Sequence, residues 1–401
     1  MSKPRIFINF HYMELGGAER ALLGLLNAFD TNSVDVDLFL NQHTGPLMSQ
    51  IPSKINLLPE IPAYSAIERP MKTIFFEGHW GVLLGRLIGK FRFRRYLKKI
   101  GRKTRDGSDS QYVFDGVTPF LPSLRWLGHY DLAISFLDPP HIVQDKIDAS
   151  IKIEWIHTDW TTVEVNKELV ASRWGRNDYI VSISKSVTKQ FLLRFPEFES
   201  KIIEIHNILS PDQVRRQSLM QEDMHEMVND GIILCSVGRI SYQKNFDSVP
   251  LVAKILKSNG LRFHWYVVGP GNHDRIDETI INENVVDCVH FVGPKSNPYP
   301  WIKACDIYVQ PSRYEGHSVT VREAQILCKP VIITNYPTAG SQILNGIDGI
   351  ICGMDNNSIA ETILSLAKDI SRQKDLIDYV STHDYGNENE VEKIYKLLNI
   401  S

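Results

Sequence analysis

Two glutamates with seven residues between them stand in the segment Arg313–Glu323, whose sequence is RYEGHSVTVRE. Glu315 precedes a glycine, and Glu323 would lie about one turn inside a helix that Ser318 or Thr320 could cap. A helix entry offers free backbone N–H groups and the positive end of the helix dipole, which suits a diphosphate. The two carboxylates could then hold hydroxyl groups on either side of it, one on a sugar and one on a ribose. An ordinary loop with solvated glutamates has the same spacing.

Two cations follow a predicted strand that closes in Gly238. They are Arg239 and Lys244, in the segment VGRISYQKN. Two cations beside a helix entry can neutralise a departing diphosphate without a metal ion. A solvated basic loop would look the same from this segment alone.

Together these two segments resemble the large retaining glycosyltransferase family 4, which has the GT-B fold. The resemblance implies two Rossmann-like α/β/α domains with a cleft between them, and it covers the second domain more specifically than the first. It implies that Arg239 and Lys244 bind the donor diphosphate, that Glu315 contacts the transferred sugar, and that Glu323 holds the ribose. Main-chain N–H groups between the glutamates would serve phosphate and sugar, at Gly316, His317, Ser318, Val319 and Thr320.

The first domain is similar to the family in two places. The turn Gly16–Gly17 resembles the N-terminal glycine loop that approaches phosphate and acceptor. His157, in IEWIHTDW at the end of a predicted strand, resembles the active-site histidine. It would contact the primary hydroxyl region of the sugar or steady the reacting centre, whereas a lone histidine beside aromatics is otherwise structural. The resemblance thus assigns catalysis to His157, Arg239, Lys244 and Glu315.

Weaker candidates lie at other predicted strand ends. Ser182 and Ser184 in VSISKS, and Asn207 in IHNILS, resemble common family segments. Recognition of the base in such folds uses main-chain groups after a strand, which here are Gly269, Gly293, Pro294 and Lys295.

Short apolar strands alternate with helical stretches along the chain, which is typical of parallel α/β domains. The first series of predicted strands is Arg5–Phe10, Val34–Leu40, Asp131–Phe136, Ile151–Ile156 and Tyr179–Ile183. The second series is Gly231–Val237, Phe263–Val268, Val289–Val292, Asp306–Gln310 and Pro330–Ile333. We expect an acceptor domain over residues 1–209, a nucleotide-sugar-binding domain over 210–380, and a C-terminal helix in 381–401 that packs back on the first domain. Ligands of such sheets bind at the carboxyl ends of the strands.

The composition is that of a globular protein without a nucleic-acid or membrane-spanning signature. The formal net charge of −3 gives the whole chain no preference for nucleic acid. No apolar run approaches the ~18 residues of a membrane span, and the first ten residues are too short an apolar run for a signal peptide. The five cysteines have no metal-ligand spacing, which favours reduced, mostly buried thiols. We therefore expect a cytoplasmic protein.

Two patterns argue against other chemistry. Asp35-Val36-Asp37 spells the Asp-x-Asp of metal-dependent transferases, but it lies inside an alternating strand, and we interpret it as the polar face of an exposed strand. His11, His43 and His79 have no partner spacing for a metal. The G-x-G-x-x-G of a dehydrogenase is absent. No metal and no cofactor are expected.

The segment Arg86–Arg105 carries ten Lys or Arg and no acid, interleaved with leucine, isoleucine, phenylalanine and tyrosine. This composition suits an interfacial helix on an anionic membrane surface, where each exposed cation is worth about 1 kcal/mol. Basic residues interleaved with aromatics could instead bind RNA. A solvated helix whose apolar side packs on its own domain is the third alternative.

The sequence thus predicts a retaining, metal-independent hexosyltransferase that moves a sugar from a nucleotide sugar, with UDP as the default nucleotide. The acceptor would be a glycan or a polyprenyl-diphosphate-linked glycan in surface polysaccharide synthesis, reached from the inner face of the cell membrane. A catalytically silent GT-B subunit that binds a partner transferase or a glycan is the alternative. A GT-B sugar epimerase or phosphorylase is a further alternative among enzymes.

Overall fold

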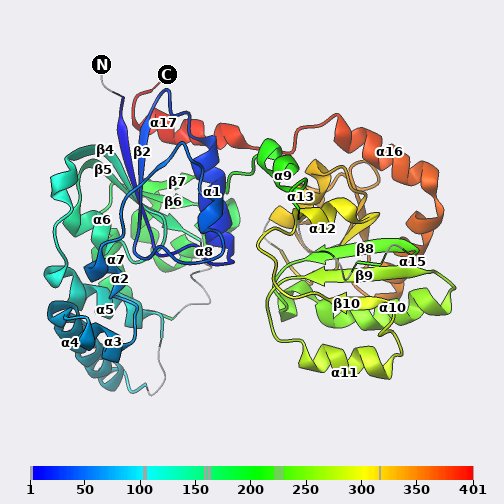
Figure 1. Ribbon diagram of the computed structural model, residues 1–401, viewed down its shortest axis with the longest axis horizontal. Helices are drawn as coiled ribbons and strands as arrows, with labels where there is room; N and C mark the ends of the chain where they lie inside the picture. Colours follow the sequence, from blue (N-terminus) through cyan, green and yellow to red (C-terminus); the bar gives the residue numbers. More distant parts are fainter. Residues whose placement is uncertain are drawn as a thin grey trace. The chain divides into compact units, whose positions relative to one another are not determined.

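The chain folds into two compact units, seen here in a computed structural model (Figure 1). The structure describes residues 3–102, 106–157, 160, 164–221, 224, 227–228, 230–315 and 318–400. The first unit comprises Met1–Ile208 together with Glu388–Ser401, and the second comprises Leu209–Asn387. The chain therefore returns to the first unit after Asn387.

The first unit is built on a seven-stranded parallel sheet in the order β3-β2-β1-β4-β5-β6-β7. Its strands are β1 (Arg5–Phe10), β2 (Asp35–Leu40), β3 (Asn56–Leu57), β4 (His129–Ser135), β5 (Asp148–Ile156), β6 (Tyr179–Ser182) and β7 (Ile202–Glu204). Its helices are α1 (Gly17–Ala28), α2 (Pro62–Ser65), α3 (Met71–Phe76), α4 (Trp80–Lys99), α5 (Ser108–Val117), α6 (His141–Lys146), α7 (Lys167–Trp174), α8 (Lys185–Arg194) and α17 (Glu392–Leu397). The strand order reverses between β1 and β4, which marks a Rossmann-like topological switch point.

The second unit repeats this plan with six parallel strands in the order β10-β9-β8-β11-β12-β13. Its strands are β8 (Ile232–Val237), β9 (Phe263–Val268), β10 (Val289–Phe291), β11 (Ile307–Gln310), β12 (Val331–Thr334) and β13 (Ile350–Cys352). Its helices are α9 (Pro211–Gln217), α10 (Val249–Ser258), α11 (Asp274–Asn282), α12 (Tyr299–Ala304), α13 (Val319–Ile326), α14 (Ala339–Gln342), α15 (Asn356–Lys368) and α16 (Ile370–Ser381). The switch point falls between β8 and β11.

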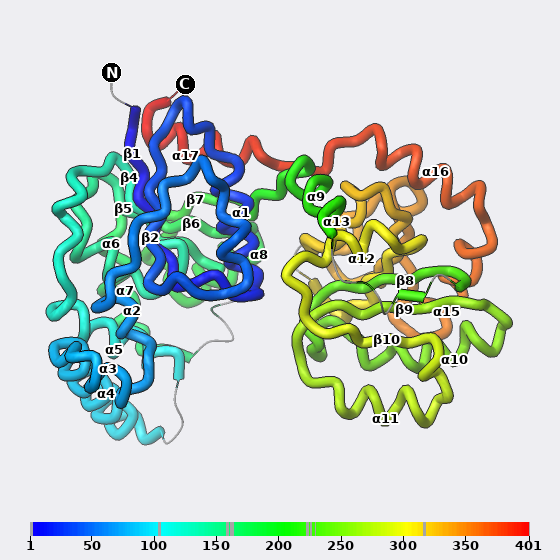
Figure 2. The backbone as a smooth tube through the Cα atoms, in the orientation of Figure 1, coloured from blue at the N-terminus to red at the C-terminus, as the bar shows by residue number. Residues whose placement is uncertain are grey.

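Apolar side chains cover both faces of each sheet, as the near-continuous apolar strands require. In the first unit, α1 and the C-terminal α17 share one core with β1, β2 and β4. Figure 2 shows this red C-terminal segment beside the blue start of the chain. The Tyr395 hydroxyl accepts a hydrogen bond from the Asp30 N–H at 2.8 Å, which fixes α17 to the end of α1. In the second unit, one core underlies α10, α11 and α15, and another underlies α12, α13 and α14.

The ten strands that the sequence predicts are confirmed, with ends that differ by no more than three residues. The short strands β3, β7 and β13 were not predicted, because two or three residues carry no periodicity. All five cysteines are free thiols, four of them buried, as expected.

The interpretation of Asp35-Val36-Asp37 as the polar face of an exposed strand is wrong for Asp37. β2 lies between β3 and β1, and the Asp37 residue is only 9% exposed. Its carboxylate pairs with the Arg5 guanidinium at 3.1 Å and accepts hydrogen bonds from the Tyr130 hydroxyl and the Asn56 amide, both at 2.6 Å. Asp37 is therefore a structural carboxylate with three donors.

We predict that Asp37→Asn lowers the free energy of unfolding by about 2–4 kcal/mol, because an amide NH₂ would face a donor and the guanidinium would lose its counter-charge. The matched control is Asp35→Asn, two residues earlier and exposed, for which we expect a change within about 0.5 kcal/mol. Urea denaturation of both variants measures this. Equal effects of the two substitutions would contradict the structural role.

Candidate functional site

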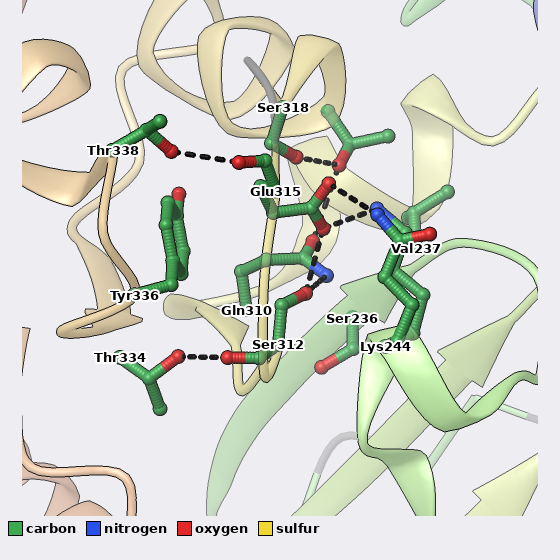
Figure 3. Close-up of polar contacts among 12 residues, drawn as sticks. Ser236, Val237, Lys244, Gln310, Ser312, Glu315, Ser318, Thr334, Tyr336 and Thr338 are labelled. Atoms are coloured by element: carbon green, nitrogen blue, oxygen red, sulfur yellow. Dashed lines mark hydrogen bonds and ion pairs between the residues drawn. The ribbon is translucent and has the colours of Figure 1, made fainter. Parts of the chain in front are cut away.

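Lys244 and Glu315 form an ion pair at the carboxyl edge of the second sheet. Lys244 belongs to a short 3₁₀ turn after β8, and Glu315 follows β11, the strand beside β8. The Lys244 Nζ lies 2.6 Å from Glu315 Oε1, and their side chains are only 16% and 6% exposed (Figure 3). The topological switch point thus brings together two of the four charged residues that the sequence singled out.

Neighbouring polar groups hold the Glu315 carboxylate from several sides. The Ser312 hydroxyl donates to Oε1 at 2.6 Å, and the Gln243 amide donates to Oε2 at 3.3 Å. The Thr338 hydroxyl donates to the Glu315 carbonyl at 2.8 Å, as Figure 3 shows. A buried carboxylate is tolerated only with such partners, so the geometry of Glu315 is fixed before any ligand binds.

Arg239 has a different environment from Lys244. Its side chain is exposed, and within residues 230–315 it makes no hydrogen bond or ion pair. The guanidinium therefore remains available for an anion, although the structure does not bring it to Glu315.

The glycines at the neighbouring strand ends allow close backbone contact. A Cβ on Gly269, whose φ is 152°, would lie 1.9 Å from the Gly238 carbonyl oxygen. The Gly269 N–H donates to the Gly293 carbonyl at 2.9 Å, and Gly293 itself has a φ of 71° with open space above it. Pro294 is exposed, and the Lys295 Nζ lies 5.3 Å from the centroid of the Trp301 ring.

The helix entry expected between the two glutamates is present. α13 begins at Val319 with Ser318 in the cap position, but the expected side-chain cap is wrong, since neither Ser318 nor Thr320 caps the helix. The two hydroxyls bond to each other at 3.1 Å instead. The first-turn N–H groups of α13 therefore have no side-chain cap, and they suit an anion. The expectation that the Ser318 main-chain N–H serves phosphate or sugar is wrong, because it donates to Gln342 Oε1 at 3.1 Å. Gly316 and His317 lie outside the described residues.

Glu323 lies inside α13 and is only 3% exposed. Its Oε1 accepts a hydrogen bond from the Tyr299 hydroxyl at 2.9 Å. Tyr299 begins α12, so Glu323 is held at the side of the sheet where α12 packs. The sequence did not single out Tyr299, because no local pattern links it to α13.

In the first unit, an acidic side chain covers the glycine turn. Gly16 precedes α1, and a Cβ placed on it would lie 2.1 Å from Glu19 Oε2. Burial raises the pKa of Glu19, and Glu14 raises it further. An anion at Gly16–Gly17 would therefore require Glu19 to move or to take up a proton.

His157 directly follows β5 in the first unit. Its ring lies 4.7 Å from the Phe136 ring and is stacked at 9° on the Trp155 ring. Burial lowers the pKa of His157 to about 4, against a hydrogen bond with the Phe136 backbone that raises it. The imidazole is therefore neutral at pH 7.

Ser182 and Ser184 have local structural roles. Ser184 caps α8 by accepting a hydrogen bond from the Val187 N–H at 3.2 Å, and the Ser182 hydroxyl donates to the Ser184 carbonyl. Asn207 follows β7. All three residues belong to the first unit, whereas the Lys244–Glu315 pair belongs to the second.

Two buried acids near the carboxyl ends of β4 and β5 were missed by the sequence analysis. Burial raises the pKa of Asp138 to about 6, while Asp138 accepts a hydrogen bond from the Trp174 indole at 2.9 Å. Burial raises the pKa of Glu154 well above its usual range, and the charge of Asp138 raises it further. These carboxyls had no motif to mark them.

The two sheets define the GT-B fold that the sequence predicted. The structure aligns with the crystal structure of HepE from Anabaena in complex with UDP and glucose, with a TM-score of 0.64 over 99% of each chain and 12% identity. At this identity the likeness concerns the fold alone.

The family match lies within the second unit. Residues 221–383 match the family model described as "Glycosyl transferases group 1". The capsular polysaccharide biosynthesis glycosyltransferase CapM of Staphylococcus aureus is 32% identical over 159 residues, which is 38% of this chain and 41% of CapM. An N-acetylgalactosamine-N,N'-diacetylbacillosaminyl-diphospho-undecaprenol 4-alpha-N-acetylgalactosaminyltransferase of Campylobacter jejuni is 25% identical over 214 residues, 52% of this chain and 56% of that protein. The chain thus spans about two fifths to just over half the length of these relatives.

Among the described residues, no helix combines the length and apolar character that crossing a membrane requires. In the same residues, no three His, Cys, Asp or Glu side chains are grouped closely enough to hold a metal ion.

We predict that the His157 ring stays neutral in the folded protein from pH 8 down to about pH 5, because its pKa is about 4. An unfolded histidine titrates near 6.5. His157 therefore stabilises the fold above that pH, and this contribution is lost as the pH falls from about 6.5 toward 4. NMR of the imidazole resonances, assigned with His157→Asn, measures the midpoint. A midpoint near 6.5 would contradict the buried environment.

Proposed function

We propose that this protein is a glycosyltransferase that moves a sugar from a nucleotide sugar to a glycan acceptor. The observation that carries this proposal is the Lys244–Glu315 pair at the switch point of the group 1 domain. A cation, a fixed carboxylate and an uncapped helix entry there can bind a diphosphate and a sugar hydroxyl side by side.

In this proposal each part of the donor has its own residues. Lys244, with Arg239, neutralises the diphosphate, and the first-turn N–H groups of α13 bind its oxygens. Glu315 accepts hydrogen bonds from the sugar, and Glu323 from the ribose. The base lies over the strand ends at Gly269, Gly293, Pro294 and Lys295. The HepE complex supports UDP as the nucleotide to test first.

We further propose a retaining reaction without a metal ion, as in family 4. The cations at the diphosphate site supply the positive charge that a metal would otherwise bring to the leaving group. The departing diphosphate would leave from the face that the acceptor hydroxyl attacks. His157, neutral at pH 7, can accept or donate a hydrogen bond to the sugar near that centre.

The acceptor follows from the relatives. The name of the Campylobacter enzyme specifies a diphospho-undecaprenol acceptor, and CapM acts in capsular polysaccharide biosynthesis. We propose a polyprenyl-diphosphate-linked glycan as the acceptor class, in the synthesis of a surface polysaccharide.

We predict that one nucleotide sugar, from a panel of UDP- and GDP-sugars with EDTA present, raises the melting temperature of the protein and that Lys244→Ala abolishes this shift. The physical reason is the loss of the cation that compensates the diphosphate. Lys254→Ala, which removes an exposed cation of α10, is the control and should keep the shift. No shift with any donor would favour the catalytically silent subunit.

A lipid-linked acceptor would require access to a membrane, and we propose that α3 and α4 provide it. Four large apolar side chains of α4 recur at helical spacing and are 49–65% exposed, namely Trp80, Leu84, Leu87 and Phe91. Phe76 of α3 is 83% exposed, and Phe75 packs against Trp80 with ring centroids 4.5 Å apart. This row, the α3–α4 apolar surface, is unusual for a face in contact with water.

The cations of α4 continue along the same helix. Exposed Arg94, Arg95, Lys98 and Lys99 follow the apolar residues toward its end. The opposite face packs closely on α5, because a Cβ on Gly85 would lie only 2.6 Å from the Gly116 carbonyl oxygen. One face of α4 therefore packs on its own domain, as one alternative from the sequence expected, while the apolar row and the cations are exposed, as another expected. An apolar row beside a cationic end suits anionic lipid, which supports the proposed position on the inner face of the membrane.

We predict co-sedimentation with vesicles of phosphatidylglycerol and phosphatidylcholine, and little with phosphatidylcholine alone. Changing Arg94, Arg95, Lys98 and Lys99 together to Ala should weaken binding at least tenfold, since each cation contributes about 1 kcal/mol near such a surface. Changing Lys254, Lys303, Lys368 and Lys374 of the second unit removes the same charge and should have little effect. Equal losses in both variants, or no preference for anionic vesicles, would contradict the surface.

A further inference from the structure

Gln310 is a fully buried polar side chain between the two parts of the proposed donor site. It is the last residue of β11 and has 0% exposure. Its amide contacts three hydroxyl groups, those of Tyr308, Ser312 and Thr320. Figure 3 shows it directly beside Ser312 and Glu315.

The carboxylate of Glu315 fixes which groups donate and which accept in the row of hydrogen bonds that runs through Ser312 and Gln310. A carboxylate only accepts, so the single proton of Ser312 must point at Glu315 Oε1, 2.6 Å away. The Ser312 oxygen is then left to accept from Gln310 Nε2 at 2.9 Å. The amide therefore has one allowed orientation, with its NH₂ toward Ser312.

The other end of the same amide reaches the start of α13. With its NH₂ committed, Gln310 presents Oε1 to the Tyr308 hydroxyl at 2.8 Å and the Thr320 hydroxyl at 3.2 Å. Thr320 lies in the first turn of α13, and its oxygen is 3.1 Å from the Ser318 hydroxyl in the cap position. Ser318 provides no side-chain cap for α13 because its hydroxyl is turned toward Thr320 and this row of hydrogen bonds.

We propose that Gln310 is a positioning residue that holds the Glu315 carboxylate and the first turn of α13 in one fixed geometry. The group that contacts the sugar and the N–H groups that contact the diphosphate are then aligned before the donor binds. Pre-organisation of this kind avoids ordering costs at the moment of binding. The inference rests on the proposed function and assigns no direct ligand contact to Gln310.

Two near-isosteric substitutions separate this role from simple filling of space. Gln310→Met keeps the length of the side chain but removes its donor and its acceptor. Gln310→Glu, when ionised, offers only acceptors, so Ser312 loses its donor and faces two carboxylates. When protonated, the same carboxyl supplies one O–H to Ser312 and one oxygen to Tyr308 and Thr320, which restores the pattern of the amide.

The experiment is calorimetric titration between pH 5.5 and 8.5 with the nucleotide sugar that binds the wild type most tightly among UDP- and GDP-sugars. We expect Gln310→Met to weaken affinity about tenfold at every pH. Gln310→Glu should weaken the affinity at pH 8.5. Its affinity relative to that of the wild type at the same pH should recover as the pH falls. If Gln310→Glu binds as tightly as the wild type at every pH while Gln310→Met is weakened, the inference is also supported, because burial then keeps the new carboxyl protonated.

The matched control is Gln325→Met. Gln325 is also fully buried, lies in α13, and donates to the Asp348 carbonyl at 3.0 Å, outside the row of hydrogen bonds around Gln310. Gln325→Met should change the affinity for the nucleotide sugar less than threefold. If Gln310→Met does not fold, the pH dependence of Gln310→Glu decides, because one sample is compared with itself: recovery of affinity as the pH falls supports the inference, and affinity that does not change with pH overturns it.

The inference is overturned if Gln310→Met binds within threefold of Gln325→Met, or if Gln310→Glu is weakened equally at every pH. Failure of the proposed function is a different result: the wild type then binds no nucleotide sugar at any pH.

Discussion

The candidate site depends on one buried ion pair, Lys244–Glu315. Removing both charges from water is costly, and only a short contact and further hydrogen bonds offset that cost. The 2.6 Å separation, the Ser312 hydroxyl and the Gln243 amide meet this requirement. The loop after β8 and the loop after β11 can hold the pair because their strands are neighbours at the switch point. The parallel sheet thus positions the chemistry, and the ion pair in turn fixes the loops.

The sequence singled out Lys244 and Glu315 because they lie in short segments with recognisable spacing, but it did not predict that they pair. It predicted the longer strands for a similar reason, since an apolar run between turns is visible in one dimension. It did not predict Asp37, Tyr299 or Gln310, whose roles depend on partners that come together only in the fold. Arg5 and Tyr130, the partners of Asp37, lie 32 and 93 residues away in the chain. Spacing carries no information about such contacts.

The two units differ in how much of their function the relatives can inform. The group 1 match, residues 221–383, falls entirely in the second unit and includes Lys244, Glu315 and Glu323. The first unit has the same kind of sheet, but its particular features lie outside that match: the neutral His157, the buried Asp138 and Glu154, and the α3–α4 apolar surface. The proposed donor chemistry therefore rests on the group 1 domain and the proposed acceptor on the relatives, whereas the proposed membrane access rests on this chain's own side chains.

The central claim is that Lys244 and Glu315, although in contact, serve different parts of the donor. The measurement is calorimetric binding of UDP and of the matching nucleotide sugar to the wild type and to Glu315→Gln. The account predicts that Glu315→Gln keeps its affinity for UDP and loses the additional affinity that the sugar gives the wild type. An equal loss for UDP and for the nucleotide sugar would contradict the account, because Glu315 would then act only by holding Lys244.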